Sequence, residues 1–311
     1  MTSRPFKQVD VFTATPYFGN PLAVVLDGAG LSDDAMQRFA QWTNLSETTF
    51  VLPASVEARA VGADYRVRIF TPGGELPFAG HPTLGTCHAW LQAGGQPRAP
   101  THIVQECKIG LVNIRRDGTR LAFAAPPLKR SAPGPALLAQ MAGALGLKAT
   151  QIVTAQMLDN GPVWLGLLLD SVDTVLQLQP NHLDLKNLGF KVGVAALAQT
   201  SAGSGLIARS NREARAFSGS TSSPVTAGIS ADMEVRAFAA PIGVNEDPVT
   251  GSLNASLAQW LMAEGHAPQH YVAAQGTCLG RAGRVHIAQD AQGQVWVGGE
   301  SATCVDGLVV L

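Results

Sequence analysis

Three ionisable side chains stand in sequence contexts that suit acid–base chemistry. His81 precedes Pro82, which fits the first turn of a helix, and its imidazole has an ordinary pKa near neutrality. Asp247 also precedes a proline, at the predicted start of a second helix. Glu47 lies among hydroxyl and apolar residues, where partial burial would raise its pKa into the range of a general acid–base group. We therefore expect Glu47, His81 and Asp247 to be catalytic.

Each of these residues also has a purely structural explanation. His81 can be a local hydrogen-bonding residue at a capped helix start, and Asp247 can serve only as an N-cap. Glu47 can face solvent from a strand, as glutamates usually do. The residues after Asp247 favour function, because two hydroxyls and a glycine surround the same helix start, where an anion would bind. We expect the anionic group of a substrate to contact Gly80, Thr250, Gly251 and Ser252.

Two stretches, residues 67–94 and 235–265, repeat one order of strand, turn, helix start and helix end. Both predicted helices carry almost no charge, which is typical of a helix buried on all sides. His81 and Trp90 are nine positions apart, whereas Asp247 and Trp260 are thirteen apart. The difference of four is about one helical turn, so the second helix can be one turn longer without rotating its apolar face.

The elements before the first copy of the repeat can be read from their patterns. Residues 8–13 and 22–26 alternate as two strands of a hairpin. Ser32 is a suitable N-cap for a helix over 33–43, and residues 45–52, which contain Glu47, are predicted to form a strand.

The duplication predicts two halves of one α+β protein, each a curled sheet around a central helix. A Pro- and Gly-containing linker at 131–136 places the boundary near residue 128. Residues 1–128 would carry Glu47 and His81, and residues 129–311 would carry Asp247. The final strand could cross back to complete the first half.

Composition excludes several classes of function. Among 311 residues the net charge is −1 and the basic residues are scattered, so we expect no nucleic-acid partner. The four cysteines match no zinc or disulfide pattern, and no phosphate-binding or dinucleotide motif is present, so we expect no metal and no cofactor. No apolar run approaches the ~18 residues of a membrane span, and the N-terminus lacks a signal-peptide pattern. We expect a cytoplasmic protein.

Several motifs together resemble the PhzF-like isomerase family of phenazine biosynthesis, and they occur in the family's order along nearly the whole chain. They are Asn20-Pro21, residues 44–50, residues 78–83, residues 246–252, Gln275-Gly276, residues 280–283 and residues 297–299.

The resemblance implies a diaminopimelate epimerase-like fold, a site in the cleft between the halves, and a cofactor-independent homodimer. A typical member isomerises trans-2,3-dihydro-3-hydroxyanthranilate. By resemblance, Glu47 is the acid–base group, His81 and Asp247 are site residues, and Gly80 and Ser252 contact the ligand.

The chain departs from the wider superfamily at both helix starts. Diaminopimelate epimerases and proline racemases carry a cysteine there, whereas this chain has His81 and Asp247. We therefore expect a cofactor-independent isomerase that moves one proton within a small carboxylated, unsaturated substrate. Two alternatives remain open: an epimerase or lyase acting on another hydroxy or amino acid, and a non-catalytic protein that binds a small ligand.

Overall fold

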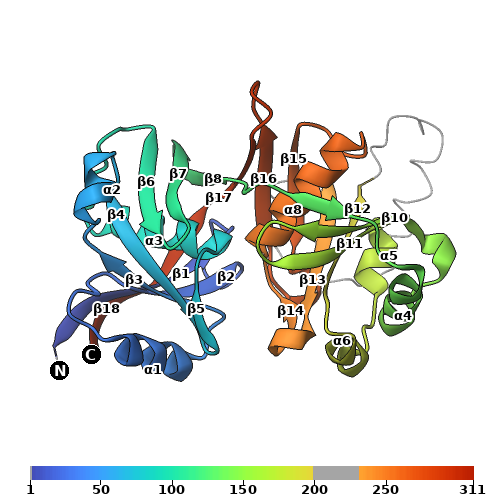
Figure 1. The fold of residues 1–311 in the computed structure, drawn as a ribbon, viewed down its shortest axis with the longest axis horizontal. Helices are drawn as coiled ribbons and strands as arrows, with labels where there is room; N and C mark the ends of the chain where they lie inside the picture. The colour runs from blue at the N-terminus through green and yellow to red at the C-terminus, as the bar shows by residue number, and fades with distance from the viewer. Residues whose placement is uncertain (1, 199–230) are drawn as a thin grey trace, which may run out of the picture.

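The computed structural model describes residues 2–198 and 231–311, which form two similar halves side by side (Figure 1). The first half contains β1 (Ser3–Val11), β2 (Asn20–Val25), β3 (Thr48–Leu52), β4 (Tyr65–Thr71), β5 (Gly74–Leu76), β6 (His102–Cys107), β7 (Gly110–Asp117) and β8 (Arg120–Ala124). Its helices are α1 (Asp33–Thr43), α2 (Val56–Ala60) and α3 (Gly80–Gln92).

The second part of the chain supplies a matching set of strands and helices. The strands are β9 (Lys129–Ser131), β10 (Ile152–Asp159), β11 (Val163–Leu169), β12 (Lys191–Leu197), β13 (Met233–Ala239), β14 (Val244–Asp247), β15 (His270–Gln275), β16 (Gly283–Gln289), β17 (Val295–Gly299) and β18 (Ser301–Val310). The helices are α4 (Pro135–Leu145), α5 (Val172–Gln177), α6 (His182–Leu188) and α8 (Gly251–Ala263), with 3-10 turns η1 (Ala149–Gln151), η3 (Ala240–Ile242) and η4 (Thr277–Leu279). None of the helices in these described ranges is long and apolar enough to span a bilayer.

Strand pairing repeats in order and in sense between the halves. In the first half, β1–β2 is antiparallel, β2–β3 parallel, β3–β4 antiparallel and β4–β6 parallel. In the second, β10–β11 is antiparallel, β11–β12 parallel, β12–β13 antiparallel and β13–β15 parallel. The predicted pair of similar halves is confirmed.

The chain passes between the halves twice. It enters the second half at the short strand β9, which pairs with β10, and it returns to the first half at the last strand, β18, which pairs with β1. The two sheets join where β8 pairs with β17. A long strand near the C-terminus thus completes the sheet that the N-terminus begins.

Each half wraps its sheet around one buried helix, α3 or α8, as the low charge of these segments predicted. The largest buried apolar cluster surrounds both helices and includes Leu84, Phe123, Leu253 and Trp260. Three smaller clusters lie elsewhere among the described residues, one beneath α1, one beneath α4 to α6 and one around α2.

The extra turn that the spacing allowed in the second helix is absent. Both central helices have 13 residues. The four additional residues precede α8, because the chain runs from Asp247 at the end of β14 to Gly251 before the helix begins. The spacing difference therefore reflects a different entry into the helix and not a longer helix.

The repeat also preserves an ion pair in the hairpin before each central helix, half-buried in the first half and more deeply buried in the second. Arg68 on β4 bonds both carboxylate oxygens of Glu75 on β5, at 2.8 and 2.9 Å. Arg236 on β13 bonds both oxygens of Glu246 on β14, at 2.9 and 2.8 Å. Bidentate pairs fix geometry as well as supply energy, so they set the direction from which the chain enters α3 and α8.

Several predicted boundaries hold and one moves. The 8–26 hairpin is present as β1 and β2, and α1 spans 33–43 with Ser32 accepting from the Ala35 N–H as its N-cap. The strand predicted over 45–52 begins only at Thr48. The first central helix begins at Gly80, so Pro82 is its third residue.

Candidate active site

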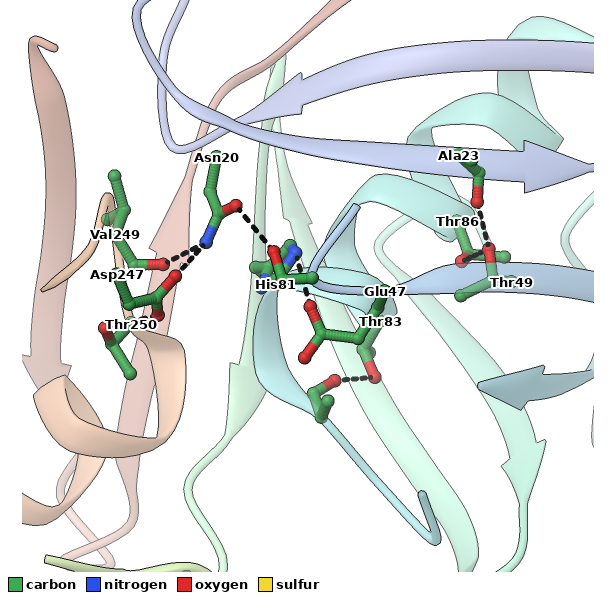
Figure 2. A network of polar contacts seen from close by, with 12 residues as sticks. Asn20, Ala23, Glu47, Thr49, His81, Thr83, Thr86, Asp247, Val249 and Thr250 are labelled. Atoms are coloured by element: carbon green, nitrogen blue, oxygen red, sulfur yellow. Dashed lines mark hydrogen bonds and ion pairs between the residues drawn. The ribbon is translucent and has the colours of Figure 1, made fainter. Parts of the chain in front are cut away.

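Glu47 lies in a tight connection between α1 and β3, not on the strand where it was expected. Asn44 ends α1 in the left-handed conformation, with a φ of 53°, which asparagine tolerates better than most residues. The chain bends over the next three residues, and the Thr43 and Thr48 hydroxyls, 2.9 Å apart, close the connection. This bend turns the Glu47 side chain toward the junction between the halves (Figure 2).

His81 is the second residue of α3, as its position before Pro82 suggested. Its helix has no side-chain cap, because the N-cap residue is Ala79. The Thr83 hydroxyl bonds back to the Ala79 carbonyl at 2.9 Å and stabilises this first turn. The first N–H groups of α3 are therefore not used by a capping side chain.

Asp247 is not the N-cap that its Asp-Pro context predicted. It ends β14, where it pairs with Ala237, and the N-cap of α8 is Thr250. The Thr250 hydroxyl does not cap the helix either, since it donates to the Asp247 Oδ2 at 2.6 Å. Asp247 is thus a strand-end carboxylate held beside an uncapped helix start.

The structure brings Glu47 and His81 into direct contact. Glu47 Oε2 and His81 Nε2 lie 3.2 Å apart, with 15% and 6% of the respective side chains exposed (Figure 2). Their mutual geometry does not form a directed hydrogen bond, and both atoms are buried without another partner among the described residues. Buried polar atoms usually have a hydrogen-bond partner, so this pair is suited to bond a third group.

Burial sets the protonation states of all three residues. It raises the pKa of Glu47 to about 8, and the negative charge of Asp247 adds to the rise. Burial lowers the pKa of His81 to about 3. Burial also raises the pKa of Asp247 to about 6, although hydrogen bonds from Thr250 and Asn20 oppose this. At neutral pH the site therefore holds a mostly protonated Glu47, a neutral imidazole and a mostly ionised Asp247.

The side-chain amides of Asn20 and Gln275 fix Asp247 in place. The sequence analysis did not assign these two amides to the site. Asn20 Nδ2, from the first half, donates to Asp247 Oδ1 at 3.0 Å and to the Val249 carbonyl at 2.9 Å (Figure 2). Gln275 Nε2 donates to the Asp247 carbonyl at 3.0 Å and to the Thr250 hydroxyl at 2.9 Å. Asn20 and Gln275 both belong to the motifs that carry the family resemblance, and this was the signal that could have assigned them to the site.

The residues predicted to bind the anionic group are gathered at the meeting point of α3 and α8. Gly80 and Gly251 pack against each other across the junction. Thr250 is turned toward Asp247, as described above. Ser252 Oγ accepts a hydrogen bond from Trp164 Nε1 at 3.2 Å, which leaves its own hydroxyl proton able to donate.

None of the four cysteines stands in the first turn of α3 or α8. Cys87 is in the body of α3, and Cys107 ends β6; both thiols are buried. Burial raises the pKa of the Cys87 thiol to about 12. Across residues 2–198 and 231–311, no group of three or more His, Cys, Asp and Glu residues is placed to hold a metal ion.

Several known proteins are similar to this chain over nearly its whole length. The family model for phenazine biosynthesis-like proteins matches residues 9–307. Antisense-enhancing sequence 1 of Schizosaccharomyces pombe is 34% identical, and the match covers 99% of each chain. The trans-2,3-dihydro-3-hydroxyanthranilate isomerase of Pseudomonas aeruginosa is 31% identical over 97% of this chain and 98% of the relative.

Solved structures show the same architecture. A PhzF-family phenazine biosynthesis protein from Bacillus anthracis superposes with a TM-score of 0.78 over all of both chains, at 22% sequence identity. The predicted diaminopimelate epimerase-like fold is confirmed.

Proposed function

This chain belongs to the family of phenazine biosynthesis-like proteins and is an isomerase of that family, and from this premise we propose that it moves one proton within a small carboxylated, unsaturated substrate. The P. aeruginosa relative is named for trans-2,3-dihydro-3-hydroxyanthranilate, and a compound of this class is the proposed substrate. Glu47, His81 and Asp247 are the proposed catalytic residues.

One observation carries the proposal: a buried carboxyl group with a raised pKa faces an unpartnered imidazole at the junction of the halves. A carboxylate whose pKa is about 8 is a much stronger base than an exposed glutamate. In its ionised form Glu47 takes a proton from one carbon of the substrate, and the double bond shifts. The resulting carboxylic acid returns that proton to another carbon, so one group both accepts and donates.

The other residues orient the substrate and balance its charge. His81 is neutral, so its ring can donate or accept one hydrogen bond with a substrate amine or hydroxyl. The first N–H groups of α3 and α8 lack capping side chains, and both helix dipoles favour an anion at their meeting point. The proposed binding contacts are Gly80, Thr250, Gly251 and Ser252.

The buried, single carboxyl group distinguishes this reaction from a two-thiol epimerisation. The test is turnover of trans-2,3-dihydro-3-hydroxyanthranilate in deuterated water, analysed by mass spectrometry. Transfer by one shielded group retains much of the original hydrogen in the product, whereas two-base epimerisation incorporates solvent deuterium. Glu47→Gln should reduce turnover by about 10²-fold or more. Full turnover by Glu47→Gln would overturn the mechanism.

A further inference from the structure

Lys191 is a cation beside the proposed active site that no motif identified. It is the first residue of β12 and is half-buried. Its Nζ lies 4.8 Å from the centre of the Trp164 ring. No acidic side chain of the described residues lies within ion-pair distance of this ammonium. Its positive charge nevertheless acts on Asp247 and partly opposes the rise that burial causes in the pKa of that carboxyl.

Strand register explains why Lys191 and Asp247 share a location. Gly193, two residues along β12, pairs with Ala237 on β13, which in turn pairs with Asp247. Paired residues and residues two apart point to the same face of a sheet. A Cβ added to Gly193 would meet Leu253 of α8 at 2.3 Å, so this face is the one covered by the start of α8.

Trp164 and Ser252 form the surroundings of the Lys191 ammonium. Trp164, with 3% of its surface exposed, pairs with Lys191 across the β11–β12 ladder and forms an apolar wall beside the ammonium. The indole N–H of Trp164 donates to Ser252 Oγ on α8. The ammonium, the ring and the Ser252 hydroxyl therefore form one connected wall at the α8 side of the junction.

We propose that Lys191 binds the carboxylate of the substrate, together with the Ser252 hydroxyl, and that it makes the site selective for acids. The proposal rests on the proposed function, because it concerns the same substrate and site. A half-buried cation without an anionic partner is costly in free energy, and a ligand carboxylate supplies that partner. The positive charge also offsets repulsion between an anionic ligand and the ionised Asp247.

The test is equilibrium binding by calorimetry with two matched ring compounds. One is 3-hydroxyanthranilate, the stable aromatic analogue of the proposed substrate class, and the other is 2-aminophenol, the same ring without the carboxylate. The wild-type protein should prefer the acid by about tenfold or more. Lys191→Met should lose this preference to within about threefold, and Lys191→Arg should keep most of it. The exposed Lys186→Met on α6 is the matched control and should keep the full preference.

The measurements are made at pH 8, where Asp247 is ionised in the wild type, so that loss of preference does not arise from protonation of Asp247. Thermal denaturation confirms that each variant is folded. An unchanged preference in Lys191→Met, or no preference in the wild type, would overturn the proposal. Equally tight binding of inorganic phosphate, lost in Lys191→Met, would overturn its carboxylate selectivity. Acid-selective binding without turnover would instead count against the proposed reaction alone.

Discussion

Gly80 and Gly251 meet across the junction of the two halves, each as the first residue of a central helix. A Cβ added to Gly251 would lie 3.2 Å from the Gly80 Cα, and one added to Gly80 would lie 3.3 Å from the Gly251 Cα. Because neither residue has a side chain, the N-termini of α3 and α8 come together. The two helix dipoles, which the duplication supplies, thus act on one place.

This contact predicts that alanine at either glycine is harmful. In Gly80→Ala the new methyl would also lie 2.6 Å from the Phe123 ring, so we expect a loss of about 1–3 kcal/mol in the free energy of unfolding. In Gly251→Ala the methyl would press on the His81 backbone nitrogen at 3.2 Å, so we expect a larger loss of kcat/KM than of stability. Urea denaturation and turnover measure the two effects.

Gly143 provides the control for helix glycines. It is exposed on α4, and a Cβ added there meets nothing within 4 Å. Gly143→Ala should therefore raise stability by up to about 1 kcal/mol through helix propensity and leave turnover unchanged. Wild-type kcat/KM in both Gly80→Ala and Gly251→Ala would contradict the importance of the close contact.

The raised pKa of Glu47 predicts a stability that depends on pH. Below the ordinary pKa of 4.5, Glu47 is protonated in both the folded and the unfolded chain, and its burial carries no charge penalty. As pH rises from 4.5 through about 8, the unfolded chain ionises first and the folded protein loses stability. Glu47→Gln should therefore be more stable than the wild type at pH 9, by at most about 5 kcal/mol, and equally stable near pH 4.

Thermal denaturation across this pH range checks the prediction. A constant difference in Tm between Glu47→Gln and the wild type at all pH values would show that Glu47 ionises normally in the folded protein. The same titration bears on function, because turnover that needs ionised Glu47 should rise with pH as this group loses its proton.

His81 should matter far more than the other histidine of the same helix. His81 contacts Glu47, whereas His88 lies two turns further along α3 and its Nε2 is 3.0 Å from the Thr303 hydroxyl. We expect His81→Gln to lower kcat by about 10²-fold or more. His88→Gln should change kcat by less than about threefold. Equal effects in the two variants would show that α3 needs histidines for packing and not for catalysis.

The sequence allowed the duplication to be recognised because buried helices and strands have local patterns. The repeated Val-Arg-X-Phe strands, starting at Val67 and Val235, gave the two halves and their central helices. Asp247 was misplaced because an Asp-Pro pair is a good local signal for an N-cap. In the folded protein, the carboxylate instead accepts hydrogen bonds from Thr250 and from Asn20, which is 227 residues away. No local pattern contains that second contact.

Glu47 and Lys191 show the same limit. The residues around Glu47 suit a strand, but Asn44 ends the preceding helix in a left-handed turn that shifts the strand start by three residues. Lys191 begins an ordinary strand, and its significance depends on Trp164 and Asp247 in neighbouring strands. Which charges face a site is decided by long-range strand pairing, which one sequence alone does not specify.

Asn20 links the halves through Asp247, and a double-mutant cycle can measure that link. Asn20→Ala leaves Asp247 Oδ1 and the Val249 carbonyl without this donor, so we expect a loss of about 1–3 kcal/mol in stability and a clear loss of turnover. Combined with Asp247→Asn, the two changes should be non-additive by about 0.5–3 kcal/mol. Asn160→Ala is the matched control, because the Asn160 amide bonds the Ser252 carbonyl at 3.0 Å and does not contact Asp247. Strict additivity between Asn20→Ala and Asp247→Asn would mean that the amide does not hold the carboxylate in position.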